Sequence, residues 1–143
     1  MEGFGLLVGH LLGDYILQND WMASNKTNPL PILSGNSCLE PLLPSYQDAA
    51  RKWRTGNLAC LVHCVLYTLA VWSCSFWWMP LWGLMFCFAV HFPVDRFRLA
   101  GWWMRNVSGQ AAFANGPLAP WSIIVVDNTF HLLTLFLIAL VCF

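Results

Sequence analysis

Charged residues are scarce in this 143-residue chain. Asp, Glu, Lys and Arg make up 10% of it, whereas soluble domains average about 25%, and 58% of the residues are hydrophobic. The seven basic and seven acidic side chains cancel, so no excess positive charge is present to neutralise the phosphates of nucleic acid. The composition argues against an ordinary soluble domain and against nucleic acid as a partner, and it favours a lipid bilayer as the surroundings.

The first residues of the chain also lack basic side chains. A cleaved signal peptide begins with a basic region, and Met-Glu-Gly-Phe-Gly has none. We therefore expect the first apolar segment to be retained. The chain has six cysteines, but most lie in apolar runs, where cysteine behaves as a small apolar residue, so we expect no disulfide framework. The cysteines in apolar runs are Cys60, Cys64, Cys74 and Cys87.

Four apolar segments are long enough to be considered as membrane-spanning helices, which need about 20 mostly apolar residues. These segments are residues 3–22, 58–79, 81–99 and 121–143. The second and fourth meet the requirement clearly. The third meets it if its charged residues are sheltered by protein, and the first is the weakest because it ends in Gln18, Asn19 and Asp20. The sequence thus predicts an all-α, polytopic membrane protein, with residues 1–143 forming one bundle of about four transmembrane helices.

The connectors complete this prediction. Residues 23–57 form the first connector, and prolines prevent one long helix there because proline lacks the N–H donor and clashes with the preceding turn. Those prolines are Pro29, Pro31, Pro41 and Pro44. We expect residues 46–54 to form a short helix at the membrane surface. Pro80 marks a tight turn, which should make an antiparallel hairpin of the second and third helices.

The basic residues predict the orientation in the membrane. In a four-helix topology all of them fall on one side: Lys26, Arg51, Lys52, Arg54, Arg96, Arg98 and Arg105. Basic residues are enriched in cytoplasmic connections, so this side should be cytoplasmic. Both termini would then lie outside the cytoplasm.

Histidine and aspartate recur at one spacing within these apolar segments. Each of the four histidines lies in a different segment, and three have a carboxylate four residues away: His10 with Asp14, His91 with Asp95, and His131 with Asp127. His63 has Tyr67 at the same spacing. Residues four apart share one face of a helix. Ionisable groups in apolar segments usually face one another, a cavity or a metal, so this spacing indicates a shared polar site.

The predicted depth of these residues supports the same conclusion. At 1.5 Å per residue, one polar residue of each segment lies roughly 8–12 Å below the cytoplasmic end of that segment: Asp14, His63, His91 and Asp127. We predict that they converge on one site that holds a divalent metal ion, with these ligand candidates: His10, Asp14, His63, His91, Asp95, Asp127 and His131. Imidazole and carboxylate together suit zinc, iron, manganese or nickel. In a hydrolase, Asp14 or Asp127 would be the catalytic base for a metal-bound water.

Three other interpretations stay open on the sequence alone. Chains of histidine and aspartate also form proton or ion pathways in pumps and transporters. The same residues can form a hydrogen-bonded network that only sets helix register. Asp95, next to Arg96 and near Arg98, also fits a salt-bridged helix end at the membrane interface.

Small residues recur every four positions on the first apolar segment. Gly5, Gly9 and Gly13 form a stripe of the kind that lets membrane helices approach closely. The stripe lies on a different face from His10. Its partner is either another helix of the chain or a second copy of it in a homo-oligomer.

The run HLLGDYILQNDWMA, residues 10–23, resembles the opening signature of a small, uncharacterised family of bacterial and bacteriophage integral membrane proteins. Later features are similar too: a histidine in the second helix, His-Phe-x-x-Asp at His91 to Asp95, and Asp-x-x-x-His at Asp127 to His131. The resemblance implies a multi-pass protein of the bacterial inner membrane, or a phage accessory protein acting on the host envelope. It names no reaction. A looser similarity links the layout to small membrane proteins described as metal-dependent hydrolases, which is an analogy of fold only.

Overall fold

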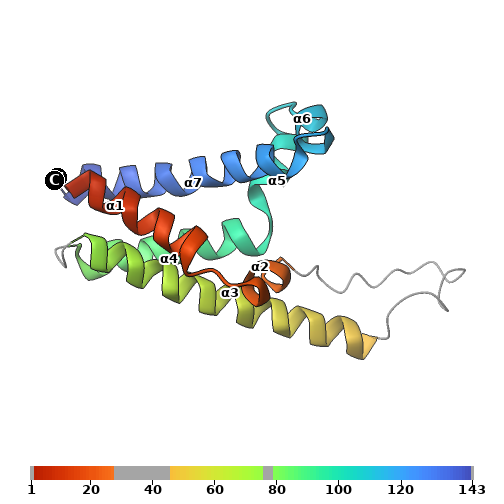
Figure 1. The fold of residues 1–143 in the computed structure, drawn as a ribbon, viewed down its shortest axis with the longest axis horizontal. Helices are drawn as coiled ribbons and strands as arrows, with labels where there is room; N and C mark the ends of the chain where they lie inside the picture. The colour runs from red at the N-terminus through yellow and green to blue at the C-terminus, as the bar shows by residue number, and fades with distance from the viewer. Residues whose placement is uncertain (1, 28–45, 76–78, 143) are drawn as a thin grey trace, which may run out of the picture.

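A computed structural model describes residues 2–27, 46–75 and 79–142 of the chain. Within these ranges every regular element is a helix, which confirms the all-α prediction (Figure 1). The elements are α1 (Glu2–Leu11), a π-helix η1 (Leu12–Ile16), α2 (Asp20–Asn25), α3 (Tyr46–Cys74), α4 (Leu81–Arg96), α5 (Leu99–Asn106), α6 (Ala111–Asn115) and α7 (Ala119–Cys142). The prolines of the first connector lie outside the described residues.

Helix α3 organises the bundle. It packs against α1, η1, α2 and α4, while α7 packs against α1, α4, α5 and α6 (Figure 1). One apolar cluster joins the long helices: Leu6, Tyr67, Val71, Met79, Cys87, Leu135 and Ile138. Large apolar side chains also cover the outside of the bundle, and Leu81 and Val141 are each 73% exposed. The outer surface therefore resembles the core in composition.

The first apolar segment is not the single helix predicted for residues 3–22. Helix α1 ends at Leu11, a π-helix continues to Ile16, and α2 begins only at Asp20. The side chain of Asn19 accepts a hydrogen bond from the Met22 backbone N–H at 2.9 Å and so caps α2. Asparagine is a strong N-cap residue because its side-chain oxygen accepts a hydrogen bond from a backbone N–H of the first turn, which has no partner within the helix. The polar residues after Leu17 thus begin a new helix, which packs against α3.

The remaining helix ends differ from the predictions in smaller ways. Helix α3 is continuous from Tyr46, so the predicted surface helix at residues 46–54 forms its first turns and the connector ends before residue 57. Strong helix formers such as Ala and Arg fill this stretch. Helix α4 ends at Arg96 rather than at residue 99, because Arg98 has a left-handed backbone with φ of 53°. Helix α7 agrees closely with the predicted residues 121–143.

Two of the described helices are long and apolar enough to cross a membrane. They are Asp48–Cys74 within α3 and Ala119–Cys142, which is α7. Gly3–Ile16 is apolar but shorter, and α4 has 16 residues, fewer than the roughly 20 that a straight span requires. The four-span topology therefore stays a prediction.

Two glycines of the predicted stripe lie against α3 of the same chain. A Cβ atom on Gly9 would lie 2.6 Å from the Cα atom of Val71, and one on Gly13 would lie 2.6 Å from Cδ2 of Tyr67. Both separations are far below van der Waals contact. The small residues therefore let α1 and η1 approach the α3 backbone, as the sequence predicted for a helix pair. Self-association of the chain through Gly5, Gly9 and Gly13 stays a separate prediction.

Candidate metal centre

All four histidines point into the bundle from four different helices. His10 lies on α1, His63 on α3, His91 on α4 and His131 on α7. None is more than 2% exposed. Asp95 of α4, which is 4% exposed, joins them. Burying so many polar groups among apolar residues is costly unless they bind one another or a ligand, so this cluster needs a chemical explanation.

Asp14, His63 and His91 form a compact set that we call the inner trio. Oδ1 of Asp14 lies 3.3 Å from Nε2 of His63 and 3.6 Å from Nε2 of His91. The two Nε2 atoms are 3.1 Å apart. Ligands of a tetrahedral zinc ion, with bonds of about 2.0–2.1 Å, lie about 3.3 Å from one another. The three atoms therefore have the spacing of ligands around one metal ion.

His91, Asp95 and His131 form a second group that could hold a metal ion. Oδ2 of Asp95 lies 3.4 Å from Nε2 of His91, and Oδ1 lies 3.3 Å from Nε2 of His131. The inner trio also uses Nε2 of His91, and one imidazole nitrogen has a single lone pair for a metal. The two groups are therefore alternatives rather than a pair of sites occupied together through that atom.

His10 and Asp127 lie at the edges of this cluster and belong to neither group. Nδ1 of His10 is 3.2 Å from Oδ2 of Asp14, so His10 contacts the trio through the second oxygen of that carboxylate. Oδ2 of Asp127 is 3.4 Å from Nε2 of His131, and the Asp127 side chain is 30% exposed. The structure thus brings all seven residues predicted from the sequence into one network of contacts. Their roles as ligands or catalytic groups stay predictions.

Polar neighbours fix the position of His10. Its Nε2 atom lies 2.8 Å from Oδ1 of Asn128, and its Nδ1 atom lies 3.2 Å from the hydroxyl of Tyr67. Asn128 also donates a hydrogen bond to the hydroxyl of Tyr15. Tyr67 in turn stacks on the ring of His91, with ring centroids 3.8 Å apart. The sequence had paired Tyr67 with His63 by spacing, but nothing in it indicated Asn128 or Tyr15.

Lys26 is a charged residue of the site that the sequence did not indicate. Its Nζ atom lies 2.6 Å from Oδ2 of Asp95 and 3.4 Å from Nε2 of His63. Burial by itself would lower the pKa of Lys26, but the surrounding carboxylates, Asp95 first and then Asp14 and Asp127, raise that pKa above its ordinary value. The sequence placed Lys26 among the basic residues of the connector. The one available signal was the polar break before α2, which returns the chain toward α3.

Arg96 also departs from its expected role. It is 3% exposed, its Nε atom donates to Oδ1 of Asn57 at 2.7 Å, and its guanidinium lies 4.0 Å from the centroid of the Trp53 ring. One guanidinium nitrogen donates to the backbone carbonyl of Lys26 at 3.4 Å. Asp95 points into the site, where it pairs with Lys26. The geometry therefore favours a site role for Asp95 over the salt-bridged helix end.

Two histidine nitrogens lack the partner that metal ligands usually have. A metal-bound histidine normally donates its other N–H to a carboxylate, carbonyl or water. The Nδ1 atoms of His63 and His91 are buried and have no hydrogen-bond partner among the described residues. The His91 ring stacks on Tyr67 and on His131, with the His131 centroid 4.0 Å away, whereas the His63 ring has only tilted contacts with Tyr67 and His91.

The described cysteines are free thiols, and none belongs to either candidate group. Cys60 and Cys64 are fully buried on α3, and their Sγ atoms are 3.9 Å apart. They pack beside the site, as the sequence predicted.

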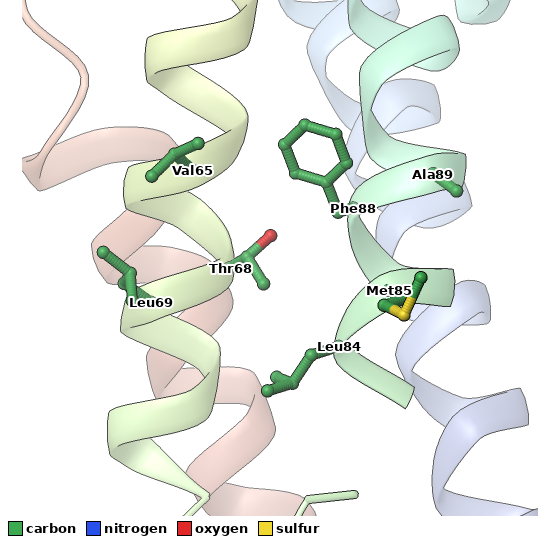
Figure 2. A pocket seen from close by; sticks show the side chains of 7 residues that line it. All are labelled: Val65, Thr68, Leu69, Leu84, Met85, Phe88 and Ala89. Carbon is green, nitrogen blue, oxygen red and sulfur yellow. The ribbon is translucent and has the colours of Figure 1, made fainter. Parts of the chain in front are cut away.

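An apolar groove lies between α3 and α4. It has a volume of about 400 Å³, and Figure 2 shows side chains of the two helices on its two sides. They are Val65, Thr68, Leu69, Leu84, Met85, Phe88 and Ala89. The Thr68 hydroxyl is buried without a hydrogen-bond partner among the described residues. The groove suits a hydrocarbon chain better than a polar ligand.

Comparisons with known proteins do not indicate a function, so the functional argument rests on the geometry of the site. No family model, curated protein or solved structure matches the chain.

Proposed function

We propose that the chain is a multi-pass membrane protein that binds one divalent metal ion at the inner trio and uses it for hydrolysis. The membrane part is supported by the two long apolar helices and by the low content of charge. It is also supported by the apolar outer surface of the bundle, which in water would be a large exposed patch. Helix α1 with η1, and helix α4, would complete four spans.

We place the positively charged end of the bundle in the cytoplasm. The elements near all seven basic residues are α2, the first turns of α3, the end of α4, and α5. In Figure 1 these segments lie toward one end of the bundle, and the start of α1 and the end of α7 lie at the other. This arrangement supports a protein of the bacterial inner membrane with both termini outside the cytoplasm.

One observation carries the metal proposal: the ligand atoms of Asp14, His63 and His91 are 3.1 to 3.6 Å apart. Two imidazole nitrogens and one carboxylate oxygen form a donor set that zinc accepts, with one position left for water. A bound zinc ion would supply an activated water, whose pKa can fall to about 7. His10 orients Asp14, and Asp127 is a carboxylate outside the trio that is available for proton transfer.

The apolar groove supports a substrate with a hydrocarbon part. All of its lining residues except Thr68 are apolar, and it runs between α3 and α4, the helices that carry His63 and His91 (Figure 2). A substrate whose acyl or isoprenoid chain lay in this groove would have its polar head group held close to the helices that carry the two histidines. We therefore propose a lipid-like or membrane-proximal substrate.

Metal analysis of purified protein tests this function. The wild-type chain, purified in detergent and dialysed, should retain about one equivalent of divalent metal. Asp14→Ala and His63→Ala should lose it, because each removes a ligand of the trio. Cys64→Ala is the matched control, since Cys64 is as buried as His63 and neighbours it on α3. Absence of metal from the wild-type protein, or full retention in both variants, would disprove the proposal.

The same network gives a second candidate function some support. Contacts of 3.0 to 3.4 Å connect Asp14, His63, Asp95, His131 and Asp127 in an unbroken series across the bundle. Such series carry protons in pumps and transporters. A metal-free protein that conducts protons in liposomes would favour this pathway over the hydrolase.

A further inference from the structure

Two carboxylates compete for the same pair of imidazoles. His63 and His91 form a triangle with Oδ1 of Asp14, and they form another with Oδ2 of Asp95, which lies 3.0 Å and 3.4 Å from the two Nε2 atoms. If both carboxylates bound one ion, it would have four protein ligands. Zinc sites closed in this way are structural, whereas catalytic sites keep a position open for water or substrate.

Lys26 forms an ion pair with Oδ2 of Asp95, the oxygen that lies nearest the imidazoles of His63 and His91. Its ammonium lies 2.6 Å from Oδ2, while His131 holds Oδ1 at 3.3 Å. Both oxygens of Asp95 are thus engaged by groups outside the inner trio. Among the described residues no lysine or arginine pairs with Oδ1 of Asp14, which is buried without a hydrogen-bond partner there and lies 3.3 and 3.6 Å from the two Nε2 atoms.

The placement of Lys26 is built into the fold. The cap at Asn19 starts α2, whose packing on α3 brings Lys26 to the site. Arg96 then donates to the Lys26 backbone carbonyl while its own guanidinium is anchored on α3 at Asn57 and Trp53. The Lys26 side chain is 15% exposed, unlike that of an ordinary surface lysine. Lysine is rarely buried unless it is paired.

We propose that Lys26 keeps one coordination position of the metal ion open by withholding Asp95 from it. This inference rests on the proposed metal site. With Lys26 present, the ion takes Asp14, His63 and His91, and water or substrate fills the fourth position. Without Lys26, Asp95 becomes the fourth ligand and closes the site. Lys26 is therefore a positioning residue that separates a catalytic centre from a structural one.

Cobalt(II) substitution tests this directly, because its visible absorption reports the ligand set and azide can bind only at an open position. Wild type, Lys26→Arg and the exposed-residue control Lys52→Met should all bind cobalt and change their spectra on adding azide. Lys26→Met should bind cobalt on the order of 10-fold more tightly and lose the azide response. Weaker or unchanged cobalt affinity in Lys26→Met, or a preserved azide response, would show the inference to be wrong.

A second pair of variants covers the case in which Lys26→Met does not fold, since that change leaves Asp95 buried without its cation. Asp95→Asn removes the competing carboxylate, so adding Lys26→Met to it should leave cobalt affinity and the azide response unchanged. A 10-fold difference in affinity between the Asp95→Asn single and double variants would contradict the inference. If wild type binds no cobalt, the proposed metal function itself fails, and this result is distinct from the others.

Discussion

At the scale of single residues, the site contains the three side chains of the inner trio and the side chains that contact and orient them. Nε2 of His63 and of His91 face Oδ1 of Asp14, whereas His10 reaches only the other oxygen of that carboxylate. A direct ligand contributes a bond to the metal, and a residue behind it contributes orientation. Variants of the two kinds should therefore differ in how strongly they affect metal binding.

We expect His63→Ala to abolish stoichiometric metal binding and His10→Ala to weaken it by roughly 10- to 100-fold. His10 is as buried as His63, so the comparison matches the two variants for burial. Competition with a chelator of known affinity measures the difference. Equal losses in the two variants would contradict the division into ligand and orienting residue. Each change should also lower the free energy of unfolding by about 1–3 kcal/mol, because it leaves buried partners unsatisfied.

Variants of Asp14 and Asp127, the two candidate catalytic aspartates, should likewise differ in how much metal they retain. Asp14→Ala should remove the metal, whereas Asp127→Ala should leave metal content near that of wild type, since Asp127 is partly exposed and, within the described part of the site, contacts His131 rather than the inner trio. If hydrolysis of a lipid-like ester is detected, Asp127→Ala should lower kcat with metal still bound. Metal analysis and turnover on the same preparation check this. Loss of metal in Asp127→Ala would place that carboxylate among the ligands.

At the scale of helices, the close approach of α1 and η1 to α3 is what brings His10 and Asp14 to the centre. Gly9 and Gly13 permit this approach because they carry no Cβ. The break after Ile16 then lets α2 turn and pack on α3 instead of continuing along the axis of α1. Helix packing, more than the identity of the polar residues, therefore determines which carboxylate meets which imidazole.

Gly9→Ala should destabilise the bundle by about 1–3 kcal/mol, because the added methyl would overlap the α3 backbone at Val71. Gly3→Ala is the control on the same helix, since a Cβ there meets nothing within 4 Å. Thermal unfolding in detergent measures both. Metal content should fall with stability in Gly9→Ala alone. Equal tolerance of the two changes would mean that α1 does not pack on α3 in this way.

At the scale of the whole molecule, the distribution of charge predicts the topology. A reporter active only in the cytoplasm should be inactive when fused after residue 143, and a reporter active only outside should be active there. The reverse result would overturn the orientation and, with it, the placement of the metal site in the cytoplasmic half. Fusions of the same two reporters at residues 106–111, between α5 and α6, are the internal control, because this connection is expected on the cytoplasmic side and should give the opposite result.

Local spacing alone was enough to predict several features of this protein. The apolar runs predicted helices because hydrophobic side chains must be buried or meet lipid, and α7 follows its predicted range closely. The spacing of four residues predicted the partners of His10, His91 and His131, because a helical turn places such residues on one face.

Only the tertiary structure decided which faces meet. The rotation of one helix against another depends on close packing at sites such as Gly13, and no periodicity within a helix contains that information. Contacts between segments far apart in the chain therefore had no signal in the sequence, as with Lys26 and Asp95 or His10 and Asn128. The sequence by itself determined which residues share a helix face. The packing of the helices determined that Lys26 meets Asp95 beside the imidazoles of His63 and His91.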